Sequence, residues 1–210
     1  MSGLDPISPA SDTSRDRWNR RYASGDRHPT PEPSRFLVAE VGGMAPGRAL
    51  DLACGAGRNA VWLAEKGWRV TAVDFSDVGL TMARDLARAR GVEVDWIEAD
   101  VVAWVPESRA YDLVCALYLQ LPAPERRRVL GHAVGALAPG GTLLVVGHDL
   151  SNLTEGWGGP PRAEVLYAPD DIVAEIDGLQ VEKAERVRRP VEEGGVLHEA
   201  IDALIRARRP

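Results

Sequence analysis

The sequence lacks long apolar runs, and it contains little cysteine. No run approaches the roughly 18 consecutive apolar residues that a membrane-spanning helix needs, which excludes a transmembrane protein. Cys54 and Cys115 are the two cysteines among 210 residues, and both stand in apolar surroundings. They do not fit a disulfide framework. At this length a single domain is the default, and folding buries enough surface for a core without crosslinks.

An excess of positive charge is also missing. Lysine and arginine number 25 against 31 aspartates and glutamates, a formal net charge of -6. Because nucleic-acid binding requires many cations on one face, we expect a small-molecule partner, with no nucleic acid and no membrane. The first ten residues lack the basic-then-apolar pattern of a secretory signal, from which we predict a cytoplasmic protein. The spacing of cysteine and histidine matches no zinc site, so no metal is expected.

Short apolar runs alternate with helical stretches along the middle of the chain. This alternation predicts parallel strands joined by right-handed crossovers, hence an α/β protein with an open, doubly wound sheet. The expected strands are 48–53, 69–74, 92–98, 112–116 and 142–147, and the helices between them are 59–66, 77–90 and 124–137, the last ended by the turn 138–141.

The two ends of the chain are organised differently. We expect a disordered tail over 1–10, cap helices and a proline-rich loop within 11–45, and the main domain over 46–210, as one domain overall. In the cap segment, a helix over 12–22, capped by Ser11 or Asp12, places Trp18 and Tyr22 on one face, and a second helix follows over 34–41. Near the other end we expect a Gly/Pro-rich loop over 151–161, a helix over 169–176, an edge strand over 179–189 with solvated arginines, and a strand or a helix over 200–208.

The first strand-to-helix loop carries two glycines in the sequence Asp51-Leu-Ala-Cys-Gly-Ala-Gly. In a doubly wound sheet a ligand binds beyond the carboxyl ends of the strands, so this loop belongs to the site. Gly55 and Gly57 allow the backbone to bend sharply and to approach a ligand closely. The spacing Gly55-x-Gly57-x-x-Ala60 also satisfies the relaxed dinucleotide fingerprint, and it leaves a nicotinamide-dependent oxidoreductase open as an alternative.

Three carboxylates stand at the ends of neighbouring predicted strands: Asp51, Asp74 and Asp100. Asp51 would place negative charge near a dinucleotide's pyrophosphate, at some cost. S-adenosylmethionine suits the arrangement better, since it has no phosphate and carries a cationic sulfonium and an ammonium. Asp74 can accept from the ribose hydroxyls, and Asp100 from the adenine amine. The carboxylates therefore favour S-adenosylmethionine as the cofactor.

These residues resemble the class I S-adenosylmethionine-dependent methyltransferases over about 18–209. The run 54–64, with its Gly-Arg-Asn sequence, looks like the branch holding tellurite-resistance and thiopurine-type methyltransferases, and 18–22 is similar to that branch's N-terminal cap. The resemblance implies a Rossmann-like, mostly parallel seven-stranded sheet with helices on both faces and the last strand antiparallel, which favours a strand over 200–208. Two positions depart from the pattern: Ala53 replaces a glycine, and Gln120 replaces a histidine found in many relatives.

The resemblance also implies which residues form the site. Those expected to bind the cofactor are Trp18, Tyr22, Asp51, Ala53, Gly55, Gly57, Arg58, Asn59, Asp74, Phe75, Ser76, Asp100, Val101 and Leu117. His148 follows the fifth predicted strand at the site end, where it could meet the acceptor. His148 and Tyr118 are the candidate bases if the acceptor is a hydroxyl, whereas a thiol or a chalcogen oxyanion needs little or no base.

The predicted function is in-line methyl transfer from S-adenosylmethionine to a small-molecule acceptor: a thiol, a chalcogen oxyanion or a hydroxyl. Trp18 and Tyr22, with the proline-rich loop, are predicted to form a lid over the cofactor. A non-catalytic S-adenosylmethionine-binding protein is the second alternative. The sequence indicates neither the acceptor nor the oligomeric state.

Overall fold

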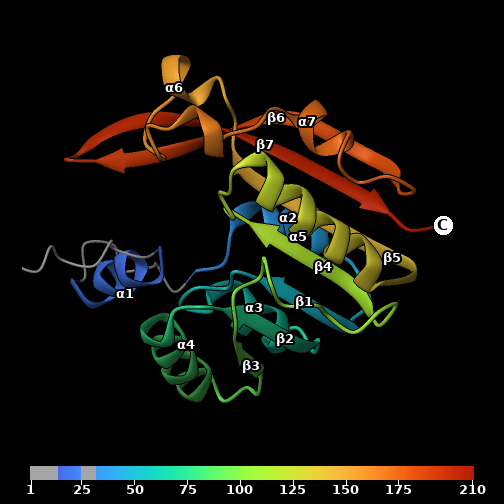
Figure 1. Cartoon of the computed structure of the whole chain (residues 1–210). Helices are drawn as coiled ribbons and strands as arrows, with labels where there is room; N and C mark the ends of the chain where they lie inside the picture. The colour runs from blue at the N-terminus through green and yellow to red at the C-terminus, as the bar shows by residue number, and fades with distance from the viewer. Residues whose placement is uncertain (1–13, 25–31) are drawn as a thin grey trace, which may run out of the picture.

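A computed structural model of the chain describes residues 14–24 and 32–210 (Figure 1). The expected tail over 1–10, the cap residues Ser11 and Asp12, and most of the proline-rich loop lie outside the described residues. The division into a cap segment over 11–45 and a domain over 46–210 stays a prediction.

Seven strands form one sheet in the order β3-β2-β1-β4-β5-β7-β6. The strands β1 to β5 pair in parallel, and β7 is antiparallel to both β5 and β6. This is the mostly parallel, doubly wound sheet that was predicted, with β6 at its edge. The strands are β1 (Arg48–Leu52), β2 (Arg69–Asp74), β3 (Asp95–Glu98), β4 (Tyr111–Leu117), β5 (Leu137–His148), β6 (Gln180–Glu193) and β7 (Val196–Arg208).

Helices cover both faces of the sheet. On one face Leu130 and Ile172, from α5 and α7, pack in a cluster with Leu50 and Val114. On the other face Leu37, from α2, packs in a second cluster with residues of α3 and α4, and Figure 1 shows α5 and α2 on opposite sides of the sheet. The helices are α1 (Ser14–Ser24), α2 (Arg35–Val41), α3 (Arg58–Glu65), α4 (Asp77–Arg90), α5 (Ala123–Ala136), α6 (Asn152–Glu155) and α7 (Pro169–Val173), with a 3₁₀ turn, η1 (Ala163–Val165). None of the described helices is long and apolar enough to cross a membrane.

The best-predicted boundaries are those with a local chemical signal. The ranges 69–74 and 77–90 match β2 and α4. The hydroxyl of Ser76 accepts from the Gly79 N–H at 2.9 Å and so begins α4, and Gly91 ends it at φ +67°. An N-cap oxygen satisfies a free amide, and a left-handed glycine closes the last turn. Local side-chain chemistry is therefore enough to set these ends.

Three segments in the second half of the chain differ from their predicted bounds, although the edge strand itself is confirmed. The predicted loop over 151–161 contains the short helix α6. The predicted turn over 138–141 belongs to β5, because Leu137 pairs with Tyr111 and Gly140 donates to the Arg209 carbonyl. The edge strand continues to Glu193 and returns as β7 through a two-glycine turn. The resulting hairpin projects on the same side of the molecule as α1 (Figure 1).

Candidate functional site

The glycine loop is fastened to the second strand by Asp74, which is 8% exposed at the end of β2. One carboxylate oxygen of Asp74 accepts from the Gly55 N–H and the other from the Ser76 N–H, each at 2.8 Å. Burial raises the pKa of Asp74, and these backbone donors oppose the rise. Each oxygen keeps a second lone pair, so Asp74 can hold the loop and still accept from a ligand hydroxyl.

Asp51 is the most exceptional carboxylate of this region. It lies in β1, is 1% exposed, and its Oδ2 has no hydrogen-bond partner among the residues that the structure describes. Burial and the charge of Asp74 raise the pKa of Asp51 to about 7, and the charge of Arg58 opposes the rise. An unpaired buried carboxylate oxygen is costly, so this position favours a ligand that brings a cation or a donor.

Three residues of the loop have left-handed backbone. Gly55 has φ +55° and Gly57 φ +78°. A Cβ at Gly57 would lie 2.6 Å from the Ala83 Cβ and 2.7 Å from Trp96, so this glycine also serves the packing of α4 against the loop. Ala53 has φ +56°, a conformation that costs a residue with a side chain about 1 kcal/mol or more. Glycine, which the resemblance implies for this position, would adopt this conformation without that cost.

Helix α1 lies over the loop and brings Tyr22 to it. A Cβ on Gly55 would lie 2.3 Å from the Tyr22 hydroxyl oxygen, so Tyr22 covers the face of the loop that Gly55 leaves open. The helix is tied down by Asn19, which donates to Asp77 at 2.7 Å and accepts from the Ser76 hydroxyl at 2.6 Å. Trp18 packs on Tyr22 with ring centroids 5.8 Å apart, but it is 40% exposed. Of the expected lid pair, Tyr22 makes the closer contact with the loop.

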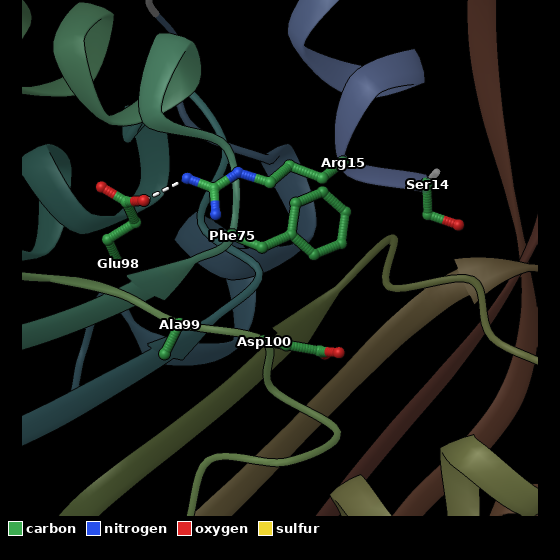
Figure 2. Close-up of a pocket in the computed structure, with 6 residues that line it drawn as sticks. All are labelled: Ser14, Arg15, Phe75, Glu98, Ala99 and Asp100. Carbon is green, nitrogen blue, oxygen red and sulfur yellow. Dashed lines mark hydrogen bonds and ion pairs between the residues drawn. The ribbon is translucent and has the colours of Figure 1, made fainter. Parts of the chain in front are cut away.

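A pocket of about 290 Å³ lies beside the loop, at the ends of β2 and β3. Figure 2 shows the Phe75 ring in this pocket, with the ion pair between Arg15 and Glu98 at one side and Asp100 at another. Asp100 is exposed, and its Oδ1 accepts from the Val102 N–H at 2.9 Å. The complete lining is Ser14, Arg15, Phe75, Glu98, Ala99 and Asp100. Sequence reasoning found Phe75 and Asp100 and missed the other four.

The remaining expected cofactor residues serve the site in different ways. Arg58 begins α3, and its charge acts on the pKa of Asp51, Tyr22 and Tyr118. Asn59 is buried, and its Oδ1 accepts from the Ser34 N–H at 2.9 Å, a tie between the cap segment and the loop. Val101 and Leu117 are buried in the core clusters.

A second polar cluster lies at the ends of β4 and β5, around the fully buried carboxylate of Asp202 in β7. His148 Nδ1 lies 3.0 Å from Asp202 Oδ1. Tyr118 and Arg189 donate to Asp202 Oδ2, each at 2.9 Å. Tyr118 has φ +59°, a strained conformation that is common at functional sites, and its ring centroid is 5.3 Å from that of His148. The structure thus brings both candidate bases together.

Within this cluster, contacts with His148 and Arg189 offset the effect of burial on the Asp202 carboxylate. Burial alone would raise the pKa of Asp202, but the contacts with His148 and Arg189 lower it below the ordinary value. Burial and the charge of Asp202 raise the pKa of Tyr118. Sequence reasoning missed Asp202, and it was wrong about one arginine of the edge strand, Arg189, which is half-buried on Asp202. Arg186, whose Nε lies 3.0 Å from the buried Asp149, and Arg188 are exposed as expected.

Comparisons with known proteins agree on one kind of domain. Residues 49–141 match a family described as a methyltransferase domain. A demethylmenaquinone methyltransferase of Thermus thermophilus is 39% identical over 104 residues, which are 49% of this chain and 47% of that protein. A trans-aconitate 2-methyltransferase of Methylobacterium radiotolerans is 34% identical over 140 residues, 66% of this chain and 51% of that protein.

The likeness extends to solved structures. The N-methyltransferase NodS from Bradyrhizobium japonicum WM9, solved in complex with S-adenosyl-L-homocysteine, has a TM-score of 0.65 and 20% sequence identity, covering 95% of this chain and 90% of that chain. At this identity the likeness is one of fold. The chain spans about half the length of the two curated relatives named above.

Proposed function

We propose that this chain, which belongs to the class I S-adenosylmethionine-dependent methyltransferases, transfers the cofactor's methyl group to a small-molecule acceptor. The family that the glycine loop resembles and its cofactor, S-adenosylmethionine, are confirmed by the domain match and by the relatives. The matches do not single out the tellurite-resistance and thiopurine branch. The acceptor and the roles of individual residues are therefore part of the proposal.

The observation that carries the proposal is the unpaired, buried Oδ2 of Asp51 beside the glycine loop. A cofactor with an ammonium and a sulfonium would supply the missing positive charge or donor. Asp74 would accept from the ribose, and the pocket with Phe75 and Asp100 would take the adenine ring. Tyr22 would close over the methionine part from the side of α1. These residues fit the cofactor's chemistry without a phosphate-binding group.

When bound, the cofactor supplies a methyl group on a positively charged sulfur that becomes neutral as the methyl leaves. The chain's part is to align the acceptor and to exclude water. Holding two reactants in line can lower a barrier by roughly 7–11 kcal/mol. Tyr118 and His148, at the ends of β4 and β5, would stand on the acceptor side. The acceptor carries a thiol, a chalcogen oxyanion or a hydroxyl group.

The proposal is tested by release of S-adenosylhomocysteine from S-adenosylmethionine in the presence of thiols, chalcogen oxyanions and phenols, with calorimetric binding of both cofactor forms measured in parallel. We expect micromolar cofactor binding and acceptor-dependent release. Binding without transfer to any acceptor would favour a non-catalytic cofactor-binding protein. Absence of cofactor binding would overturn the proposal.

A further inference from the structure

The buried cluster around Asp202 joins four elements of the structure at one point. His148 ends β5, Tyr118 follows β4, Arg189 lies in β6 and Asp202 lies in β7. The Asp202 side chain is fully buried, while that of Arg189 is 25% exposed. Burying a carboxylate among three polar side chains destabilises the fold unless each of its polar contacts is made.

The position of Asp202 beside His148 favours one tautomer of the imidazole ring. Nδ1 is buried and lies 3.0 Å from Asp202 Oδ1, in a close contact whose direction is not that of a hydrogen bond. The nearby carboxylate favours a proton on Nδ1. In neutral imidazole one nitrogen is a donor and the other an acceptor, so Nε2 is left as the acceptor. The same carboxylate stabilises the ring after it gains a second proton. This is the arrangement by which a carboxylate orients a histidine base.

The surroundings of His148 restrict water and supply few competing charges. The Tyr118 ring lies on one side. On another side the backbone at Gly159 comes so close that a Cβ there would lie 3.0 Å from two His148 ring carbons and 3.1 Å from Nε2, so only glycine leaves space beside this nitrogen. Besides Asp202, the titratable groups around this cluster include Tyr118 from the end of β4, the buried Tyr167 between η1 and α7, Arg189 and Arg186 from β6, and Asp149, the next residue of the chain. The positive charge of Arg186 is already matched by Asp149.

Position along the sheet links this cluster to the cofactor region. Asp51 in β1 pairs with Cys115 in β4, three residues before Tyr118, and Tyr118 donates its backbone N–H to the Val146 carbonyl, two residues before His148. The charge of Arg58 acts on both Asp51 and Tyr118. His148 therefore lies at the same edge of the sheet as the glycine loop, on the acceptor side of the cofactor.

We propose that His148 is the general base of the transfer, that Asp202 is its positioning residue, and that the acceptor is consequently a weakly acidic hydroxyl, of the phenol or enol class. This inference rests on the proposed function and narrows its acceptor. An acceptor that is already an anion, such as a thiolate or a chalcogen oxyanion, has no need of such a base.

The transfer conserves atoms and charge. The hydroxyl proton moves to His148 Nε2 while the acceptor oxygen forms a bond to the methyl carbon. The bond between that carbon and sulfur breaks, and its electron pair stays on sulfur. The products are a methyl ether, S-adenosylhomocysteine and a protonated imidazole beside Asp202. The imidazole then releases its proton to solvent.

The kinetic test compares a phenol with a thiol, using wild-type protein, His148→Gln and Asp202→Asn. We expect Asp202→Asn to lower kcat for the phenol about 10- to 100-fold, within the range of lost base catalysis, with KM and thiol turnover little changed. Equal losses with phenol and thiol, or full phenol activity in His148→Gln, would overturn the inference.

A matched control removes a different carboxylate from the same strand. Glu199→Gln in β7 breaks the exposed ion pair with Arg188, whose two groups lie 3.0 Å apart. We expect this variant to keep both activities and the wild-type pH profile. The same loss in Glu199→Gln as in Asp202→Asn would assign the effect to the hairpin and not to His148.

Two further measurements do not depend on turnover. Nitrogen-15 NMR of the imidazoles, assigned with His148→Gln, should find neutral His148 with its proton on Nδ1 in the wild type, and a mixture of tautomers in Asp202→Asn. In the complex with S-adenosylhomocysteine, 4-nitrophenol should bind as the phenolate, seen by absorbance, less so in His148→Gln. A proton on Nε2 would contradict the inference even if no acceptor in the panel is turned over.

Calorimetry separates this inference from the proposed function. If S-adenosylmethionine binds and the thiol is methylated, but phenol transfer does not depend on His148, the inference fails and the proposed function stands. If the cofactor does not bind, the proposed function itself fails.

Discussion

Two buried carboxylates, one in each half of the sheet, have opposite electrostatic surroundings. Among the described residues, the Asp51 Oδ2 in β1 has no hydrogen-bond partner, and the pKa of Asp51 rises to about 7. Asp202 in β7 contacts His148, Tyr118 and Arg189, and its pKa falls below the ordinary value. Under the proposed function, the half around Asp51, which would bind the cofactor, is short of positive charge. The half around Asp202, which would face the acceptor, supplies its own cation, Arg189. We refer to them as the cofactor half and the acceptor half.

Asp202→Ala tests the acceptor half and should have the largest effect on stability. Removing one member of a buried ionic cluster leaves the others unpaired, which costs about 3–5 kcal/mol. Because the folded pKa of Asp202 is lowered, its ionised form adds stability to the wild type above about pH 4, the pKa of an ordinary aspartate, and this contribution is lost as the pH falls further. Urea unfolding at pH 7 and pH 3 measures both. A loss below 1 kcal/mol at pH 7 would show that the cluster is not coupled.

Asp51→Asn tests the cofactor half, and its effect on the free energy of unfolding has the opposite sign. The raised folded pKa means that the cofactor-free wild type loses stability as the pH rises from about 4 through about 7. The amide removes this penalty, so the variant should be more stable above pH 7, by an amount on the order of 1–3 kcal/mol, and equal to wild type near pH 4. The check is urea unfolding in the absence of cofactor. A destabilised variant at pH 8 would contradict the comparison.

Tyr22→Ala tests whether α1 closes the cofactor half. Tyr22 covers Gly55, whereas Trp18 is more exposed. We therefore expect Tyr22→Ala to weaken S-adenosylmethionine binding about tenfold and Trp18→Ala to weaken it less, as measured by calorimetry; tenfold corresponds to about 1.4 kcal/mol. Unchanged affinity in both variants would remove α1 from the cofactor site.

Ala53→Gly has the smallest expected effect, on the strain of the loop. Glycine relieves the left-handed conformation at φ +56° but loses more entropy on folding, so the net gain is about 0.5 kcal/mol. Thermal unfolding detects a shift of this size when wild type and variant are measured side by side. A lower melting temperature in the variant would show that the alanine methyl contributes packing that outweighs the strain.

The cofactor half was the more predictable of the two because its signals are local in the chain. Asp51, Gly55 and Gly57 lie within seven residues, and Asp74 ends the next strand. Ser76 and Gly91 carry the cap and stop signals that set the ends of α4. Such signals need no knowledge of tertiary contacts.

The acceptor half could be predicted only in part, since its contacts join distant residues. Asp202 is 84 positions from Tyr118, and the strand that carries it also fitted a helix by pattern. Arg189 was indistinguishable from the exposed arginines near it until the hairpin placed it on Asp202. The turn at Gly194 and Gly195 was the one local signal available for that hairpin, and it was missed.

The pH dependence of S-adenosylmethionine binding to wild type and to Asp51→Asn shows whether Asp51 binds the cofactor's positive charge. If the unpaired carboxylate of Asp51 awaits the cofactor's positive charge, calorimetry will show wild-type affinity rising as the pH increases through about 7. The variant will bind more weakly, and its affinity will lack that rise. Equal affinity of the two proteins across this range would contradict the account.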